Sequence, residues 1–138
     1  MEARLRPILH GRADPRSVLL TDHVDGRSRS AVAAVRALGA AGFRVVVTVS
    51  GGRSAAAASR SASGVLQVPP VGTAGFADAV RDHLEEHPGT VVVPASDAVL
   101  VALGLPGAAL VDKTQLAERA AAAGLPVPPT RTFASVDA

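Results

Sequence analysis

Short, nearly continuous runs of aliphatic residues, separated by segments with helical periodicity, constrain the fold of this chain most strongly. The clearest run is residues 43–49, and shorter runs occupy residues 18–21, 65–68 and 90–94. Strands that are apolar on both sides are buried on both faces, as in parallel sheets. Apolar positions at helical spacing fill residues 30–41 and 76–87, and recur after Ser96. The alternation predicts a doubly wound, Rossmann-like parallel sheet of four to five strands, with helices on both faces in three α/β/α layers.

The chain of 138 residues has room for one domain of this kind. We expect an irregular lead-in over residues 1–16, the Rossmann-like domain over 17–124, and a linker with the start of a further domain over 125–138. Residues 108–111 are expected to add a short fifth strand, and residues 50–63 to form a loop with one short helix.

Composition excludes several classes of protein. Apolar residues make up 48% of the chain, but three phenylalanines are its only aromatic residues, so base-stacking platforms for single-stranded nucleic acid are not expected. Without cysteine there are no disulfides, thiolate metal ligands or cysteine nucleophiles. No apolar segment of a secretory signal is visible near the N-terminus, and proline, glycine and aspartate interrupt the most apolar window, residues 91–111. These features favour a cytoplasmic protein.

Charge is unevenly distributed along the chain. Residues 1–60 hold ten arginines and four acidic residues, whereas residues 61–138 hold four basic and eight acidic residues. The arginines are scattered and form no run. They therefore favour a phosphate-bearing small ligand or an acidic neighbouring domain over nucleic acid.

Candidate ligand-binding residues follow the predicted strands, because parallel α/β sheets bind ligands at the carboxyl ends of their strands. In the loop after the first strand, Gly26 permits a tight turn, and the following helix N-terminus is suited to a carboxylate or phosphate; a solvated turn with a serine cap is the alternative. In the loop after the second strand, the guanidinium of Arg60 could bind a carboxylate or phosphate. An arginine that is merely solvated is the alternative. After the fourth strand, Ser96 or Asp97 as the N-cap of the following helix is a simpler interpretation than contact with a ligand. The candidate anion-binding residues are Gly26, Ser28, Arg29, Ser30, Arg60, Ser96 and Asp97.

Several catalytic patterns are absent or unconvincing. The chain contains no Gly-x-Gly-x-x-Gly fingerprint, no Walker loop and no Gly-x-Ser-x-Gly elbow. His83 and His87 match the His-x-x-Glu-His pattern of inverted zincins, but they end a helix and have no convincing third ligand downstream. We interpret them as packing residues favoured by the helix dipole, and predict no metal site and no catalytic residue in the chain.

Lys113 is the only lysine, against thirteen arginines, and it directly precedes a predicted amphipathic helix over residues 114–123. A cation at a helix N-terminus opposes the helix dipole unless an anion shares the site. Lys113 is therefore a candidate phosphate contact, and an exposed lysine without function is the alternative.

Several segments together resemble one enzyme family. They are the Gly-Arg-Ser-Arg-Ser loop 26–30, Arg36-Ala-Leu-Gly-Ala-Ala-Gly42, Ala58-Ser-Arg60, Val93-Pro-Ala-Ser-Asp97, and Asp112-Lys113 followed by Gly124-Leu-Pro-Val-Pro-Pro-Thr130. Over about residues 17 to 133 the chain resembles the N-terminal, pre-ATP-grasp domain of bacterial ATP-grasp carboxylate–amine ligases. The segment from Asp112 to Thr130 is the most specific part of the resemblance.

The resemblance implies ATP-dependent activation of a carboxylate as an acyl phosphate, followed by attack of an amine. It places Lys113 beside the ATP phosphates, and Gly26–Ser30 with Ser96 and Asp97 on the carboxylate side. The glycine-rich flap, second ATP lysine and Mg²⁺ ligands of the family have no counterpart here. We therefore expect no turnover by these residues alone, ATP and Mg²⁺ as cofactors of the complete enzyme, and a C-terminal ATP-grasp domain as partner. Without that partner, residues 104–133 should expose apolar surface, and a homodimer is compatible with this.

Two other interpretations remain open. The chain could be a standalone Rossmann-like module that binds a small anion without catalysis. An NAD-dependent enzyme is disfavoured by the missing glycine fingerprint.

Overall fold

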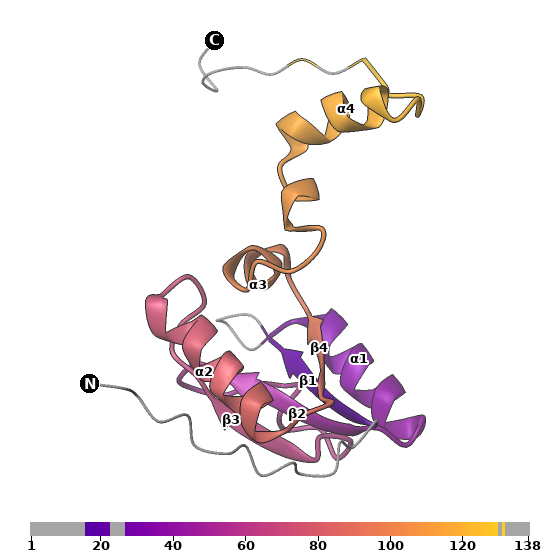
Figure 1. Ribbon diagram of the computed structural model, residues 1–138. Helices are drawn as coiled ribbons and strands as arrows, with labels where there is room; N and C mark the ends of the chain where they lie inside the picture. The colour runs from indigo at the N-terminus through magenta and orange to yellow at the C-terminus, as the bar shows by residue number, and fades with distance from the viewer. Residues whose placement is uncertain (1–15, 23–26, 130, 132–138) are drawn as a thin grey trace, which may run out of the picture.

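A parallel four-stranded sheet is the centre of the fold (Figure 1). The computed structural model describes residues 16–22, 27–129 and 131, so residues 1–15 of the lead-in, 23–26, 130 and 132–138 lie outside the described part. The spatial order of the strands is β3-β2-β1-β4, and each neighbouring pair is parallel. The predicted parallel α/β fold is thus confirmed. The strands are β1 (Ser17–Thr21), β2 (Arg44–Val49), β3 (Gly64–Gln67) and β4 (Val91–Pro94).

Helices connect and follow these strands close to the predicted ranges. They are α1 (Arg29–Ala40), α2 (Ala74–Glu86), α3 (Asp97–Ala102), the 3₁₀ helix η1 (Ala108–Leu110) and α4 (Lys113–Ala122). Among the described residues, no helix has both the length and the apolar character of a membrane span.

One face of the sheet is covered by α1 together with the connection between β2 and β3. Ala31 and Val35 of α1 and Ala56 of the connection are fully buried in one cluster with strand residues of β1 and β2. We call α1 with residues 53–62 the α1 layer. The connection consists of successive turns, and the short helix expected within residues 50–63 is not formed.

The opposite face is covered by α2 and α3. Phe76 and Val80 of α2 and Val99 of α3 are buried against Leu19 of β1 and Val68. Leu19 and its neighbour Leu20 belong to different clusters because successive strand residues point to opposite faces. Burial on both faces explains why Val18–Leu20 of β1 are all apolar.

The predicted fifth strand over residues 108–111 is wrong, since residues 108–110 form η1. Alanine is a weak strand former, and the edge of β4 offers little to pair with. Ala95 N–H donates to the Thr21 carbonyl at 3.0 Å, so by alternation along the strand Val92 and Pro94 direct their backbone groups away from β1. Proline has no N–H, which leaves Val92 as the single donor of β4 on that edge. The sheet therefore ends at β4.

The segment Arg36–Gly42, which belongs to the family resemblance, has a packing explanation. Gly39 brings α1 close to the β2–β3 connection, where an added Cβ would lie 2.7 Å from Ser61 Cβ and 3.0 Å from its carbonyl oxygen. Gly42 ends the helix region with a φ of 84°, a left-handed conformation that favours glycine. Both glycines are thus required by the backbone geometry.

Gly39→Ala is expected to lower the free energy of unfolding by about 1–2 kcal/mol, because the overpacking at Ser61 exceeds the gain in helix propensity. Gly64→Ala is the matched control, since its added Cβ would lie 3.7 Å from Val46 Cγ2, an ordinary contact. Urea denaturation followed by circular dichroism measures both variants. A Gly39→Ala protein as stable as the parent would contradict the close approach.

Beyond α3, which packs on the sheet, the chain continues away from it as a column of η1 and α4 (Figure 1). Neither η1 nor α4 contains a buried residue, and α4 packs on η1. Leu110 and Leu125 are 50% and 60% exposed, in agreement with the apolar surface expected over residues 104–133. In this structure α4 has an amphipathic sequence but little to pack against.

Candidate functional site

The point where the strand order reverses lies between β1 and β4. The chain proceeds from β1 to β2 and β3 on one side, and then crosses to β4 on the other side of β1. In open parallel sheets, ligands bind outside the carboxyl ends of the strands at this reversal point. Here those ends are Thr21 and Pro94, which are register partners. We call the residues directly after the ends of β1, β2 and β4, together with the N-terminus of the helix that follows β1, the carboxyl edge.

A buried carboxylate organises the carboxyl edge. Asp22, directly after β1, is 5% exposed, and its Oδ2 accepts a hydrogen bond from Ser54 Oγ at 2.8 Å. Its backbone N–H donates to Thr48 Oγ1 of β2 at 3.0 Å. Ser54 Oγ in turn accepts from Ala57 N–H at 3.2 Å. These bonds fix the loops after β1 and β2 to each other.

The N-terminus of α1 lies at the same edge. Ser28 is the N-cap, and its Oγ accepts from Ala31 N–H at 3.1 Å. Ser28 Oγ and Ser30 Oγ are 2.9 Å apart, and Arg29 is exposed. The serine cap that the sequence left as an alternative is therefore present. Gly26 lies outside the described residues.

The loop after β4 forms the other side of the reversal point. Ser96 is the N-cap of α3, where its Oγ accepts from Val99 N–H at 3.4 Å, and Asp97 is exposed. Thr21 Oγ1 donates to the Val93 carbonyl at 3.2 Å, which ties the end of β1 to β4. The structure thus brings Ser28, Arg29 and Ser30 to the same edge of the sheet as Ser96 and Asp97.

Arg60 is not brought to this edge. The β2–β3 connection returns to the amino ends of the strands, where Ser63 N–H donates to the Val45 carbonyl at 2.7 Å. Arg60 is near the last turn of α1, because the adjacent Ser61 faces Gly39. The arginine that follows β2 at the carboxyl edge is Arg53, next to Ser54, and it is exposed.

Asp22, Arg53 and Ser54 were not among the candidate residues selected from the sequence. Asp22 carried a usable signal, since an acidic residue directly after a buried strand lies at the carboxyl edge. Arg53 had a weaker signal in its short distance from the end of β2. Nothing in the glycine- and alanine-rich segment distinguished Ser54.

Lys113 is the first residue of α4, and its neighbour Asp112 already supplies an anion to that helix N-terminus. Asp112 is the N-cap: Oδ1 accepts from the Thr114 N–H at 2.9 Å and hydroxyl at 2.6 Å, and Oδ2 accepts from Gln115 Nε2 at 2.8 Å. The hydrogen bond from the Thr114 hydroxyl, followed by that from its N–H, lowers the pKa of Asp112. The helix N-terminus therefore needs no external phosphate.

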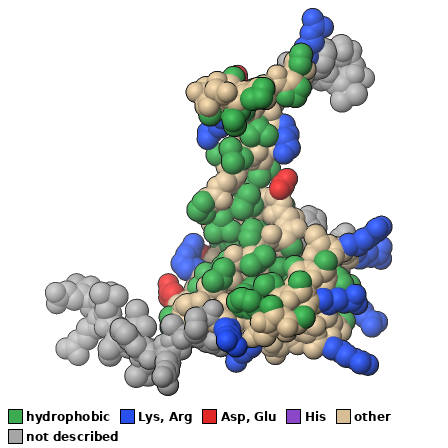
Figure 2. Space-filling model, turned by 90° about the vertical axis from the view of Figure 1, so that its right-hand side faces the viewer, with side chains coloured by type: hydrophobic (Ala, Val, Ile, Leu, Met, Phe, Trp, Pro, Cys, Tyr) green, Lys and Arg blue, Asp and Glu red, His purple; other side chains and the backbone are tan. Residues whose placement is uncertain are grey.

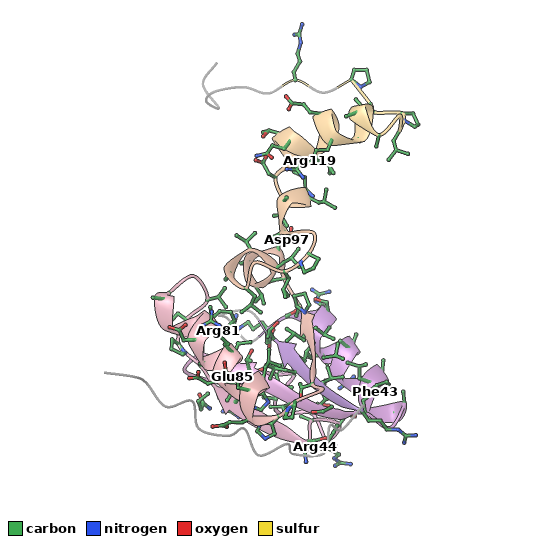
Figure 3. The ribbon with its side chains drawn as sticks, viewed as in Figure 1. Phe43, Arg44, Arg81, Glu85, Asp97 and Arg119 are labelled. Atoms are coloured by element: carbon green, nitrogen blue, oxygen red, sulfur yellow. The ribbon has the colours of Figure 1, made fainter. Side chains whose placement is uncertain are left out.

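Lys113 is also separated from the carboxyl edge. It is exposed, and α4 stands at the far end of the column. Figure 3 shows Arg119 of α4 at that far end and Asp97 at the base of the column near the sheet. Lys113 and the carboxyl edge are therefore two separate features in this structure.

Acidification is expected to release the N-terminal turn of α4. Because the folded pKa of Asp112 is lowered, its contribution is complete above the unfolded value of about 3.9 and is lost as the pH falls through the folded pKa. NMR titration of the Thr114 and Gln115 amides should report a midpoint below that value. Asp112→Asn keeps a capping side chain and should abolish the titration. A midpoint at or above the unfolded value would contradict the cap.

The two histidines of α2 pack on each other. Their rings stack with centroids 4.3 Å apart, and His87 Nδ1 lies 3.0 Å from the His83 carbonyl oxygen. Partial burial, followed by the nearby His87, lowers the pKa of His83. His83 is half-buried but His87 is exposed, so only His83 meets the predicted apolar face. In the described part of the chain, no three His, Cys, Asp or Glu side chains are grouped to hold a metal ion.

Comparisons with protein-family models, curated proteins and solved structures found no match to this chain.

Proposed function

We propose that this chain is the N-terminal domain of an ATP-grasp carboxylate–amine ligase and binds the carboxylate substrate at the carboxyl edge. The observation that carries the proposal is the reversal of strand order between β1 and β4, with Ser28–Ser30 on one side and Ser96 and Asp97 on the other. Sheets of this type bind small ligands at that point.

The charges and hydrogen-bonding groups of the carboxyl edge suit a carboxylate. The first N–H groups of the twelve-residue helix α1 and its dipole favour an anion. Arg29 and Arg53 are exposed near the ends of β1 and β2, and a guanidinium binds a carboxylate through two parallel hydrogen bonds. Asp22 acts through Ser54, by holding the β2–β3 connection against the end of β1.

ATP and Mg²⁺ would be the cofactors of the complete enzyme. The exposed Lys113 ammonium fits a phosphate as a point charge, but Asp112 already accepts from the N-terminal groups of α4. ATP supplies the phosphoryl group that activates the carboxylate. Among the described residues, no three His, Cys, Asp or Glu side chains are grouped to hold a metal ion, and in this proposal the Mg²⁺ ligands come from the ATP-grasp domain. A cytoplasmic location belongs to the same proposal.

The separation of Lys113 from the carboxyl edge favours a second candidate. A standalone module would bind a small anion at the carboxyl edge and would not use Lys113. Both candidates bind a small carboxylate at the carboxyl edge, and only the ligase also binds a nucleotide.

The coding sequence downstream of the Ala138 codon distinguishes them. The ligase proposal predicts an in-frame continuation that encodes a glycine-rich flap, a second lysine on a following strand, and acidic and asparagine ligands for Mg²⁺. A stop codon there, with none of these elements encoded in any nearby frame, would eliminate the ligase and leave the anion-binding module.

A further inference from the structure

Within the described residues, the α1 layer carries positive charge and contains no acidic residue. Residues 27–68 contain six arginines and no aspartate or glutamate. Arg29, Arg36, Arg53 and Arg60 all belong to the α1 layer, and all four are exposed. In Figure 2 several basic side chains project from one side of the body without an acidic side chain among them.

The structure, not the sequence, brings these four arginines onto one surface. The α1 helix and the β2–β3 connection cover the same face of the sheet, since Val35 and Ala56 lie in one buried cluster. Arg29 and Arg36 are seven residues apart, so they lie on the same side of α1, about 10.5 Å apart along its axis. Ser61 against Gly39 brings Arg60 near the last turn of α1.

Within the described part of the chain, none of these four guanidinium groups forms an ion pair. The opposite layer differs, because α2 exposes a line of carboxylates on its outer side and pairs Arg81 with Asp78 at 2.6 Å. Figure 3 shows Arg81 and Glu85 on this helix. Arg36 and Arg60 lie away from the carboxyl edge and are available to an external partner, and Arg29 lies where the α1 layer meets the carboxyl edge.

We propose that the α1 layer docks an acidic helical protein surface whose carboxylates repeat every two turns. An i, i+7 pair of carboxylates has the same axial spacing as Arg29 and Arg36. The residues exposed between them, Ser30 and Ala33, are small, so a partner helix can come close enough for each guanidinium to bind a carboxylate through two hydrogen bonds.

Duplex nucleic acid fits this surface less well. Its phosphates follow each other every 3.4 Å or so along the axis of each strand, a far denser array than singly spaced arginines. Single-stranded nucleic acid is disfavoured as well, because the two phenylalanines of the described residues are not exposed for stacking: Phe76 is buried and Phe43 is half-buried. The observations therefore favour a protein partner.

The test uses residues outside the carboxyl edge, so that its failure is distinguishable from failure of the proposed function. The probe is a fluorescent, alanine-rich helical peptide with glutamate at every seventh position, measured by anisotropy. The comparison probes are a peptide of the same composition with glutamates distributed around the helix, and a DNA duplex. The test variant carries both Arg36→Gln and Arg60→Gln. The matched control is the single substitution Arg119→Gln on α4.

If the α1 layer is a docking surface, the protein should bind the periodic peptide more tightly than the comparison peptide at about 10 mM salt. This preference should be largely lost by about 150 mM salt, because the Debye length falls from roughly 30 to 8 Å. The double variant should bind the periodic peptide about five- to tenfold more weakly than the parent protein, and Arg119→Gln should bind it as tightly as the parent. Equal binding of both peptides would overturn the proposal. Tighter binding of the duplex, dependent on Arg36 and Arg60, would overturn it in favour of nucleic acid.

Discussion

Phe76→Ala is expected to lower the free energy of unfolding by about 3–5 kcal/mol, the largest effect of any single substitution considered for this chain. The Phe76 side chain is fully buried between the sheet and α2, in one cluster with Leu19, Val80 and Val99. Its removal leaves a cavity that the surrounding backbone can fill only in part. Since domains of this size are stable by only about 5–15 kcal/mol, the variant should be marginally folded.

Urea denaturation followed by circular dichroism measures this loss, because the chain has no tryptophan for fluorescence. Phe43→Ala is the matched control, since Phe43 is half-buried and packs at the border of the other cluster. Phe43→Ala should lower the free energy of unfolding clearly less than Phe76→Ala does. A Phe76→Ala protein that loses under about 1 kcal/mol would contradict the buried position of this side chain.

Asp22→Ala is expected to lower stability by about 2–3 kcal/mol, because it removes the acceptor of the Ser54 hydroxyl inside a buried site. It should also loosen the β2–β3 connection, and with it the carboxyl edge. Asp22→Asn keeps an oxygen acceptor and should lose less stability than Asp22→Ala.

A double-mutant cycle with Ser54→Ala isolates the hydrogen bond between the two side chains. The expected coupling is about 1–2 kcal/mol, because the acceptor is a carboxylate and both residues are buried. Strictly additive losses for Asp22→Ala and Ser54→Ala would contradict a direct contribution of this bond.

The sequence predicted the strands well for a physical reason. Burial on both faces favours nearly continuous aliphatic runs, and β2 shows such a run over Val45–Val47 and again at Val49. The fifth strand failed because an apolar run alone does not show whether a neighbouring strand edge is free to pair. Pro94 removes a donor from the outer edge of β4, a consequence of strand direction that appears only in the three-dimensional structure.

The candidate site was only partly predictable. Ser28 and Ser96 precede helices and could be identified as caps, whereas the contact of Asp22 with Ser54 joins residues 32 positions apart. Arg60 was expected after β2 at the carboxyl edge, but the connection turns back before β3 and carries it away. The Asp112 cap could be anticipated from its position before a helix, and it changes how Lys113 is interpreted.

The most direct test of the central claim is an NMR titration of the ¹⁵N-labelled chain with a panel of small carboxylates and, separately, with tripolyphosphate. A carboxylate substrate is expected to shift the amides of Ser28–Ala31 and of Ser96–Asp97 together, with no change at Lys113 and Thr114. Ser28→Ala with Arg29→Gln should abolish these shifts, and Arg81→Gln should not. Carboxylate shifts confined to other surfaces, or absent across the panel, would contradict ligand binding at the carboxyl edge.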